Sequence, residues 1–133
     1  MSRSFIQLVN QSPQNGVVGG IINLGSVLRR FGNNLGLSGN GIEASGEGYY
    51  SILGCVTIEP TATGIVTVAV YKNGVQIPGI ISSGSVSTAE NPVTLPLLGA
   101  IRQGCCDGAD NITCVLLAGP GTITNVSFQM DKK

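Results

Sequence analysis

The side chains with the widest chemical scope lie in the segment 105–111, which reads Cys-Cys-Asp-Gly-Ala-Asp-Asn. Its candidate metal ligands are the oxygen-bearing side chains of Asp107, Asp110 and Asn111. Calcium takes roughly six to eight oxygen ligands, and an EF-hand loop ends in a glutamate that this segment lacks. We therefore expect a polar turn with two partly buried thiols, and no metal or other cofactor. The alternative is a thiol or calcium site at a subunit junction.

Cysteine chemistry has little support from the neighbouring residues. A catalytic thiolate needs a base or a cation that lowers its pKa, and the chain has no histidine. Arg102 is the one cation near Cys105 and Cys106 in the sequence. No Cys-x-x-Cys spacing suggests zinc. We expect Cys55 and Cys114, which lie in strand-like runs, to be buried apolar residues. For Cys105 and Cys106, a disulfide between subunits is the alternative to free thiols.

Paired carboxylates are the remaining route to catalysis. Glu43, Glu47 and Glu59 are the candidates for glycoside cleavage, but their region lacks the aromatic platforms on which sugars usually stack. The sequence therefore predicts no catalytic residue and no enzyme.

The balance of charge argues against two classes of partner. Seven basic residues balance seven acidic ones, and no basic stripe of the kind that binds nucleic acid or an anionic membrane is present. Only 11% of the residues are charged, against about 25% in a typical soluble domain. Apolar surface buried between subunits would explain the deficit, and a monomer with a neutral, hydroxyl-rich surface is the alternative. The N-terminus has no secretory pattern, so we expect synthesis and folding in the cytosol.

Short runs of Val, Ile, Thr and Leu between glycines and prolines are typical of an all-β protein. We predict an antiparallel jelly-roll sandwich of about eight to ten strands. Strands are expected at residues 17–24, 42–45, 49–59, 64–71, 75–83, 93–102, 112–118 and 122–130, and residues 26–31 could form a strand or one helical turn. Pro96 marks the 93–102 strand as an edge or a bulge.

Three of these runs carry specific signals. Alternation in 49–59 places Tyr50, Ile52, Val56 and Ile58 on one face. Asn73 and Gly74 supply the positive φ angles of a tight hairpin. In the last strand, the inward residues are expected to be Thr124, Val126, Phe128 and Met130.

The polar residues 1–16 are interpreted as an extended N-terminal arm that precedes a jelly-roll domain at 17–133. Three loops are expected to meet a partner, at 33–41, 83–91 and 104–111. Their contact candidates are Asn33, Asn34, Asn40, Glu90, Asn91, Asp107 and Asp110.

Some strands are apolar on both sides, and a two-layer sandwich covers only one side of each sheet. A second subunit is the simplest cover for the other side, although a loop could serve instead. The predicted oligomer interface consists of Tyr49, Leu53, Tyr71, Val115 and Leu117.

A family resemblance rests on three segments between residues 40 and 130. The Gly-Glu-Gly-Tyr-Tyr-Ser-Ile run at 46–52, the Tyr-Lys-Asn-Gly run at 71–74 and the alternating run at 122–130 resemble the tumour-necrosis-factor and complement globular-head jelly rolls. The resemblance implies a ten-stranded, non-catalytic domain that forms a tight homotrimer. No collagen-like stalk or secretion signal accompanies it, so the chain is closer in style to head-fibre, capsid-decoration or tail-tip proteins of bacterial viruses.

The sequence thus predicts a non-enzymatic structural protein on the surface of a phage or prophage particle. Its partners would be two further copies of itself and a capsid protein or a host surface receptor. The alternative is a ligand-binding module, for carbohydrate or a receptor, on a bacterial cell or spore surface.

Overall fold

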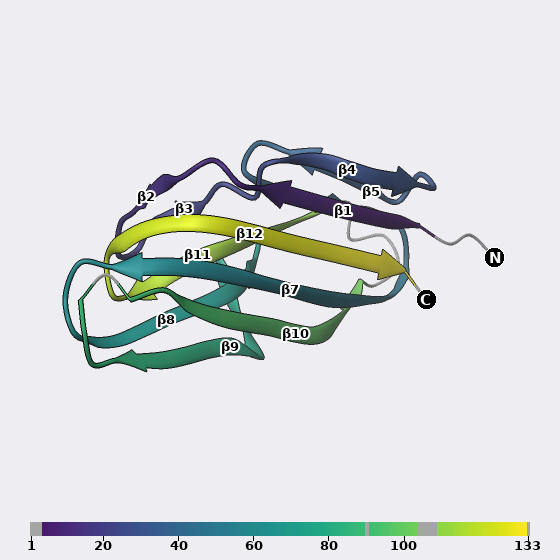
Figure 1. Ribbon diagram of the computed structural model, residues 1–133. Coiled ribbons are helices and arrows are strands. Elements are labelled where there is room, and N and C mark those ends of the chain that lie inside the picture. The colour runs from purple at the N-terminus through teal and green to yellow at the C-terminus, as the bar shows by residue number, and fades with distance from the viewer. Residues whose placement is uncertain (1–3, 90, 104–108, 133) are drawn as a thin grey trace.

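The computed structural model describes residues 4–89, 91–103 and 109–132. These residues form twelve strands and no helix (Figure 1). The strands are β1 (Phe5–Asn10), β2 (Gln14–Gly16), β3 (Ile21–Ile22), β4 (Ser26–Phe31), β5 (Leu35–Ser38), β6 (Gly41–Ala44), β7 (Gly48–Pro60), β8 (Gly64–Lys72), β9 (Val75–Val86), β10 (Val93–Gln103), β11 (Asp110–Ala118) and β12 (Gly121–Lys132).

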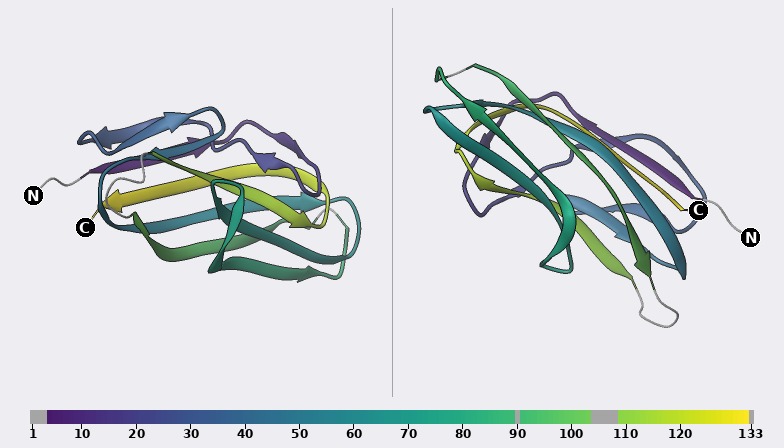
Figure 2. Two further views of the ribbon diagram at one scale, coloured as in Figure 1. Left: turned by 180° about the vertical axis from the view of Figure 1, so that it is seen from behind. Right: turned by 90° about the horizontal axis from the view of Figure 1, so that it is seen from below.

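The strands form two antiparallel sheets packed face to face (Figure 2). Sheet one has the order β10-β7-β12-β1-β4, and β2 pairs with β12 outside this path. Sheet two has the order β5-β6-β11-β8-β9, and β3 pairs with β11. Neighbours that are distant in the chain, such as β1 and β12, create the crossovers of a jelly roll, and this confirms the predicted fold class.

Alternating side chains from both sheets fill the core. Tyr50, Val56 and Ile58 are completely buried and Ile52 is 2% exposed, so the predicted face of the longest strand is confirmed. In β12, Val126, Phe128 and Met130 are also buried. Thr124 is not, because the pairing of β12 with β7 shifts register between Ile123 and Asn125, and this bulge turns Ile123 inward in its place.

The hairpin between β8 and β9 forms as predicted. Asn73 has a φ of 52° and Gly74 a φ of 82°, the left-handed conformations that a tight two-residue turn requires. Residues 26–31, which were open between strand and helix, form β4. β10 is an edge strand, in keeping with Pro96.

The expected arm is wrong for residues 5–16, which belong to the jelly roll. β1 lies between β12 and β4, and its inward side chains Ile6 and Leu8 are completely buried. Four of its six residues are apolar, but the polar residues around them in 1–16 concealed a core strand. The domain therefore begins before residue 17.

Two further boundaries differ from expectation. Of residues 17–24 only Ile21 and Ile22 are strand, because Gly19 adopts a φ of 86° and the Gly20 N–H donates to the Val17 carbonyl in a turn. The expected loops at 33–41 and 83–91 contain β5 and the end of β9. No helix of the described residues is long and apolar enough to cross a membrane.

Candidate functional site

Three apolar side chains stand on the outer face of sheet one. Leu53 of β7 and Leu98 of β10 lie directly opposite each other on paired strands and are 49% and 62% exposed. Tyr49, on the same face of β7, is 59% exposed, and the Arg102 guanidinium lies 5.9 Å from its ring centre. We call Tyr49, Leu53 and Leu98 the sheet-one patch.

Sheet two carries the other predicted interface residues, Tyr71, Val115 and Leu117, on its own outer face. Val115 is only 7% exposed, because Ile21 of β3 and Ala69 of β8 flank it in the neighbouring strands. Cross-strand neighbours in the same sheet thus shield this side chain, while Ile21 itself remains 54% exposed. The five predicted residues therefore do not form one surface, and Tyr49 and Leu53 alone lie in the sheet-one patch.

Sequence reasoning missed Leu98, although its signal was present. The inward residues of β10 are Leu95, Leu97 and Ile101, so period two places Leu98 on the outside.

The proposed metal ligands Asp110 and Asn111 bind the β8–β9 turn instead. Asn73 Nδ2 donates to Asp110 Oδ1 at 2.8 Å, and the Asn111 N–H donates to Asn73 Oδ1 at 2.8 Å. Lys72 Nζ lies 3.3 Å from Asp110 Oδ2. Asp110 is 4% exposed, so its carboxylate is turned into the fold and is not presented on the surface of the loop. Among the described residues, no three His, Cys, Asp or Glu side chains gather as a metal site would require.

The predicted contact residues divide into structural and exposed ones. Asn34 is a structural residue, because its Nδ2 donates to the Ser45 carbonyl and its N–H to Ser4 Oγ. Asn33, Asn40 and Asn91 are exposed and remain candidates for contact. Asp107 and Glu90 lie outside the described residues, as do Cys105 and Cys106.

The two described thiols differ in environment. Cys114 is completely buried in the core, as predicted, and burial raises the pKa of its thiol to about 12. Cys55 lies on the outer face of sheet one between Pro96 and Ser127 and is half-buried, so the expectation of a core position is wrong for it. The candidate carboxylates do not converge: Glu43 is in sheet two and Glu59 in sheet one.

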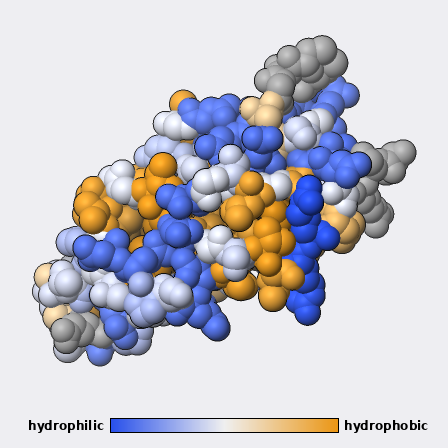
Figure 3. Space-filling view, turned by 90° about the horizontal axis from the view of Figure 1, so that it is seen from above, coloured by the Kyte–Doolittle hydropathy of each residue, from blue (hydrophilic) through white to orange (hydrophobic). Residues whose placement is uncertain are grey.

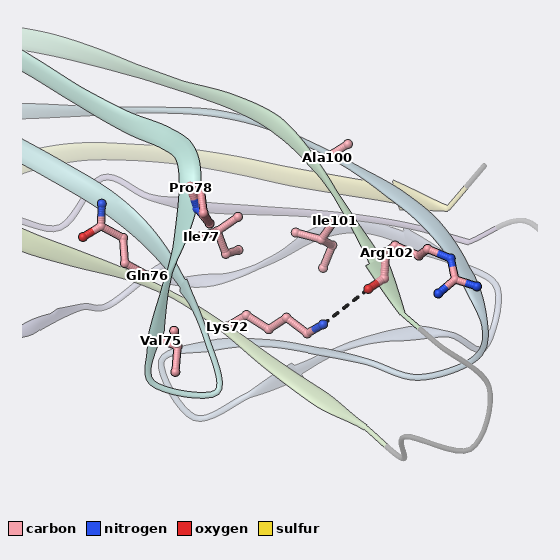
Figure 4. A pocket seen from close by; sticks show the side chains of 8 residues that line it. All are labelled: Lys72, Val75, Gln76, Ile77, Pro78, Ala100, Ile101 and Arg102. Carbon is pink, nitrogen blue, oxygen red and sulfur yellow. Dashed lines mark hydrogen bonds between the residues drawn. The ribbon is translucent and has the colours of Figure 1, made fainter.

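A pocket of about 410 Å³ lies where the edge strands β9 and β10 approach each other. Val75, Ile77 and Pro78 line one side, and Ala100 and Ile101 line the other (Figure 4). Lys72 Nζ donates to the Arg102 carbonyl at 3.3 Å, whereas the Arg102 guanidinium points away from the pocket (Figure 4). The pocket is apolar with one cation at its end and holds no aromatic ring on which a sugar would stack.

A polar hollow of about 400 Å³ lies near the turn that follows β1. Its amides are engaged with one another, since the Asn23 carbonyl accepts from Asn10 Nδ2 at 3.0 Å and from Gln14 Nε2 at 2.8 Å. These hydrogen bonds hold the segment between β1 and β4 in place, so the polar groups that line the hollow have a structural role.

Comparison with known proteins supports the fold. The structure is similar to murine APRIL, with a TM-score of 0.74, 13% identity, and coverage of 98% of this chain and 99% of that one. It is similar to the globular domain of zebrafish complement 1qA, with a TM-score of 0.71, 8% identity, and coverage of 96% and 94%. The vertex protein P5 of PRD1 has a TM-score of 0.61, 14% identity, and coverage of 98% of this chain and 72% of that one. No family model and no curated protein matches the sequence.

Proposed function

We propose that this chain is a non-enzymatic structural subunit that assembles as a homotrimer and displays its loops on a phage or prophage particle. The sheet-one patch carries this proposal. Its three large apolar side chains lie on a face that the second sheet cannot cover, and water is a poor solvent for them. The trimer follows the arrangement of the jelly rolls that the sequence resembles.

A cyclic trimer uses a heterologous contact, in which each subunit presents two different surfaces. The sheet-one patch supplies one of them. An exposed tyrosine beside an arginine matches the composition of interface centres, and the two leucines add apolar area to be buried. Tyr49, Leu53 and Arg102 therefore form the expected centre of the contact.

The test is the solution mass of the purified chain by multi-angle light scattering. The expected mass is three times the 13.6 kDa of one chain. Leu53→Glu is expected to shift the mass toward a single chain, because it buries a carboxylate in the contact. Ile65→Glu is the matched control, since Ile65 is 64% exposed on β8 of sheet two. A wild-type mass of 13.6 kDa, or equal effects of both variants, would contradict the assembly.

The particle assignment is supported by the likeness in fold to a vertex protein of PRD1. It is tested by inducing prophages in a strain that encodes the chain and labelling intact particles with an antibody against it. Label on the particle surface is the expected result. Particles whose proteome lacks the chain would exclude this part of the proposal and leave the trimer untouched.

The second candidate function, a ligand-binding module on a cell or spore surface, is favoured by the pocket between β9 and β10. Its apolar walls fit an apolar group better than a sugar. A glycan array is therefore expected to show no binding. Saturable glycan binding that is lost in Ile77→Glu would favour this candidate over a structural subunit.

A further inference from the structure

β4 differs from every other strand of four residues or more in its exposure to solvent. All six of its residues are exposed, whereas strands of a sandwich normally bury every second side chain. Val27, Leu28 and Phe31 are 39%, 52% and 58% exposed. On the side of the molecule that carries β4 and β5, apolar side chains interrupt the polar surface next to strongly hydrophilic ones (Figure 3).

The outer edge of β4 is also unpaired. β4 pairs with β1 alone, and no backbone hydrogen bond of the described residues joins it to β5. In an antiparallel pair, alternate residues direct their N–H and C=O groups away from the partner, so β4 offers a row of free donors and acceptors.

The other long edge strands, β9 and β10, each contain a proline, which β4 lacks. β9 contains Pro78 and β10 contains Pro96, and proline on an edge discourages the addition of a further strand. β4 has no proline, and Gly25 and Gly32 stand outside its ends. Its bulge at Leu28 bends the strand, so the edge suits a short partner segment better than a long one.

The charge on β4 indicates the chemistry of such a partner. Arg29 and Arg30 are adjacent and exposed, and neither guanidinium forms a salt bridge with a described residue. Arg30 Nε donates to the Leu35 carbonyl at 2.6 Å. Arg29 is paired with Gln7, so its side chain lies on the same outer face of sheet one as those of Gln7 and Phe5. Two guanidinium groups without carboxylates beside apolar side chains complement an acidic segment that also carries apolar residues.

We propose that β4 is a docking edge for a short, extended, acidic segment of another protein, which adds to sheet one as a further strand. Main-chain hydrogen bonds to β4 would supply affinity, and the guanidinium of Arg29 and the ring of Phe31 would supply selectivity. β4 and β10 are opposite edges of sheet one, so the test of this edge does not depend on the subunit contact at Leu98.

The test uses the full, ¹⁵N-labelled chain and three synthetic peptides. The first reads Thr-Val-Glu-Val-Glu-Val-Thr with blocked ends, the second replaces both glutamates by lysine, and the third replaces the central valine by proline. We expect the acidic peptide to bind saturably and to slow hydrogen exchange at the amides of residues 26–31. The lysine peptide and the proline peptide should bind at least about tenfold more weakly, because one loses the charge pairing and the other a backbone donor.

Arg29→Glu is the matched variant, with Ile65→Glu, which places a carboxylate on the exposed face of sheet two, as its control. The first should weaken binding of the acidic peptide by roughly tenfold or more and the second should leave it unchanged. Equal binding of the acidic and lysine peptides, no binding, or protection at β10 instead of β4 would overturn the proposal. Amides of β4 that are already protected before peptide is added would also overturn it, and would indicate that a second copy of the chain covers this edge.

Discussion

At the scale of single residues, Tyr50 shows how one polar atom connects the core to a turn. Its ring is completely buried, and its hydroxyl is shared between the carbonyls of Ser45 and Gly46 at 2.7 and 2.8 Å. Burial, with a smaller effect of the Asp110 charge, raises the pKa of this phenol, so it remains a hydrogen-bond donor at any ordinary pH. The chain around 45–46 therefore depends on this hydroxyl for its position.

Tyr50→Phe is expected to lower the free energy of unfolding by about 1–2 kcal/mol, because it leaves two carbonyls without this donor. Urea denaturation followed by circular dichroism measures the change. Tyr71→Phe is the control, since the Tyr71 hydroxyl makes no hydrogen bond with the described residues, and it should be near neutral. An equal loss in the two variants would show that the hydroxyl of Tyr50 is not the cause.

The buried thiol of Cys114 makes a prediction about alkaline pH. Burial raises its pKa from near 9 to about 12 in the folded chain. Between these values the unfolded chain loses the proton and the folded chain keeps it, so stability falls as pH rises through this window.

Cys114→Ala should remove this contribution, because alanine has no proton to lose. The cavity in the variant costs stability at every pH, but its unfolding free energy should fall less steeply between pH 9 and 11. The expected difference in slope is up to about 1.4 kcal/mol per pH unit. Parallel slopes for the two proteins would show that the thiol is accessible to base in the folded state.

At the scale of elements, the turn of the β8–β9 hairpin is held against β11 by its own residue Asn73. Asn73 bonds to Asp110 and Asn111 at the start of β11, so a single side chain fixes where the turn sits against the neighbouring strand. The hairpin lines one side of the pocket through Val75 and Ile77. The shape of that pocket therefore depends on this connection.

Asn73→Asp should destabilise the protein by about 2 kcal/mol at pH 7, because it replaces a donor to the buried Asp110 by a second carboxylate. The loss should shrink as the pH falls below about 4, where carboxyl groups take up protons. Thermal unfolding at both pH values measures it. Asn40→Asp, in the exposed turn between β5 and β6, is the control and should be nearly neutral.

At the scale of the whole molecule, the two ends of the chain complete one sheet. β1 and β12 pair over six residues, from Phe5 opposite Asp131 to Asn10 opposite Val126. Figure 1 shows the start of β1 and the end of β12 at the same end of the sandwich. Loss of β1 would expose the edge of β12 and detach β4 from the sheet.

Deletion of residues 2–16 is therefore expected to abolish cooperative folding. Ile6 and Leu8 alone would forfeit about 2–3 kcal/mol each of apolar burial, against a total stability of about 5–15 kcal/mol for a typical domain. Loss of dispersion in an amide NMR spectrum is the readout. A truncated chain that still unfolds cooperatively would restore the interpretation of these residues as an arm.

The sequence by itself determined the class of fold, most long strands and the hairpin. Period-two runs such as the one containing Tyr50 and Val56 specify which side is buried, and Asn73 and Gly74 specify a turn, because these signals are local properties of the chain. They also placed Tyr49 and Leu53 on an outer face.

Only the tertiary structure decided the features that depend on partners distant in the chain. Phe5–Asn10 is part of the core because β12 and β4 flank that strand. Val115 is shielded from water because Ile21 and Ala69 lie beside it in the neighbouring strands. The tertiary structure joined Asp110 to Asn73 of the β8–β9 turn and left β4 exposed at an edge. The physical reason is that the solvent exposure of a side chain depends on the packing of the whole chain. The side chains of one alternating strand are buried or exposed according to which other strands lie beside it.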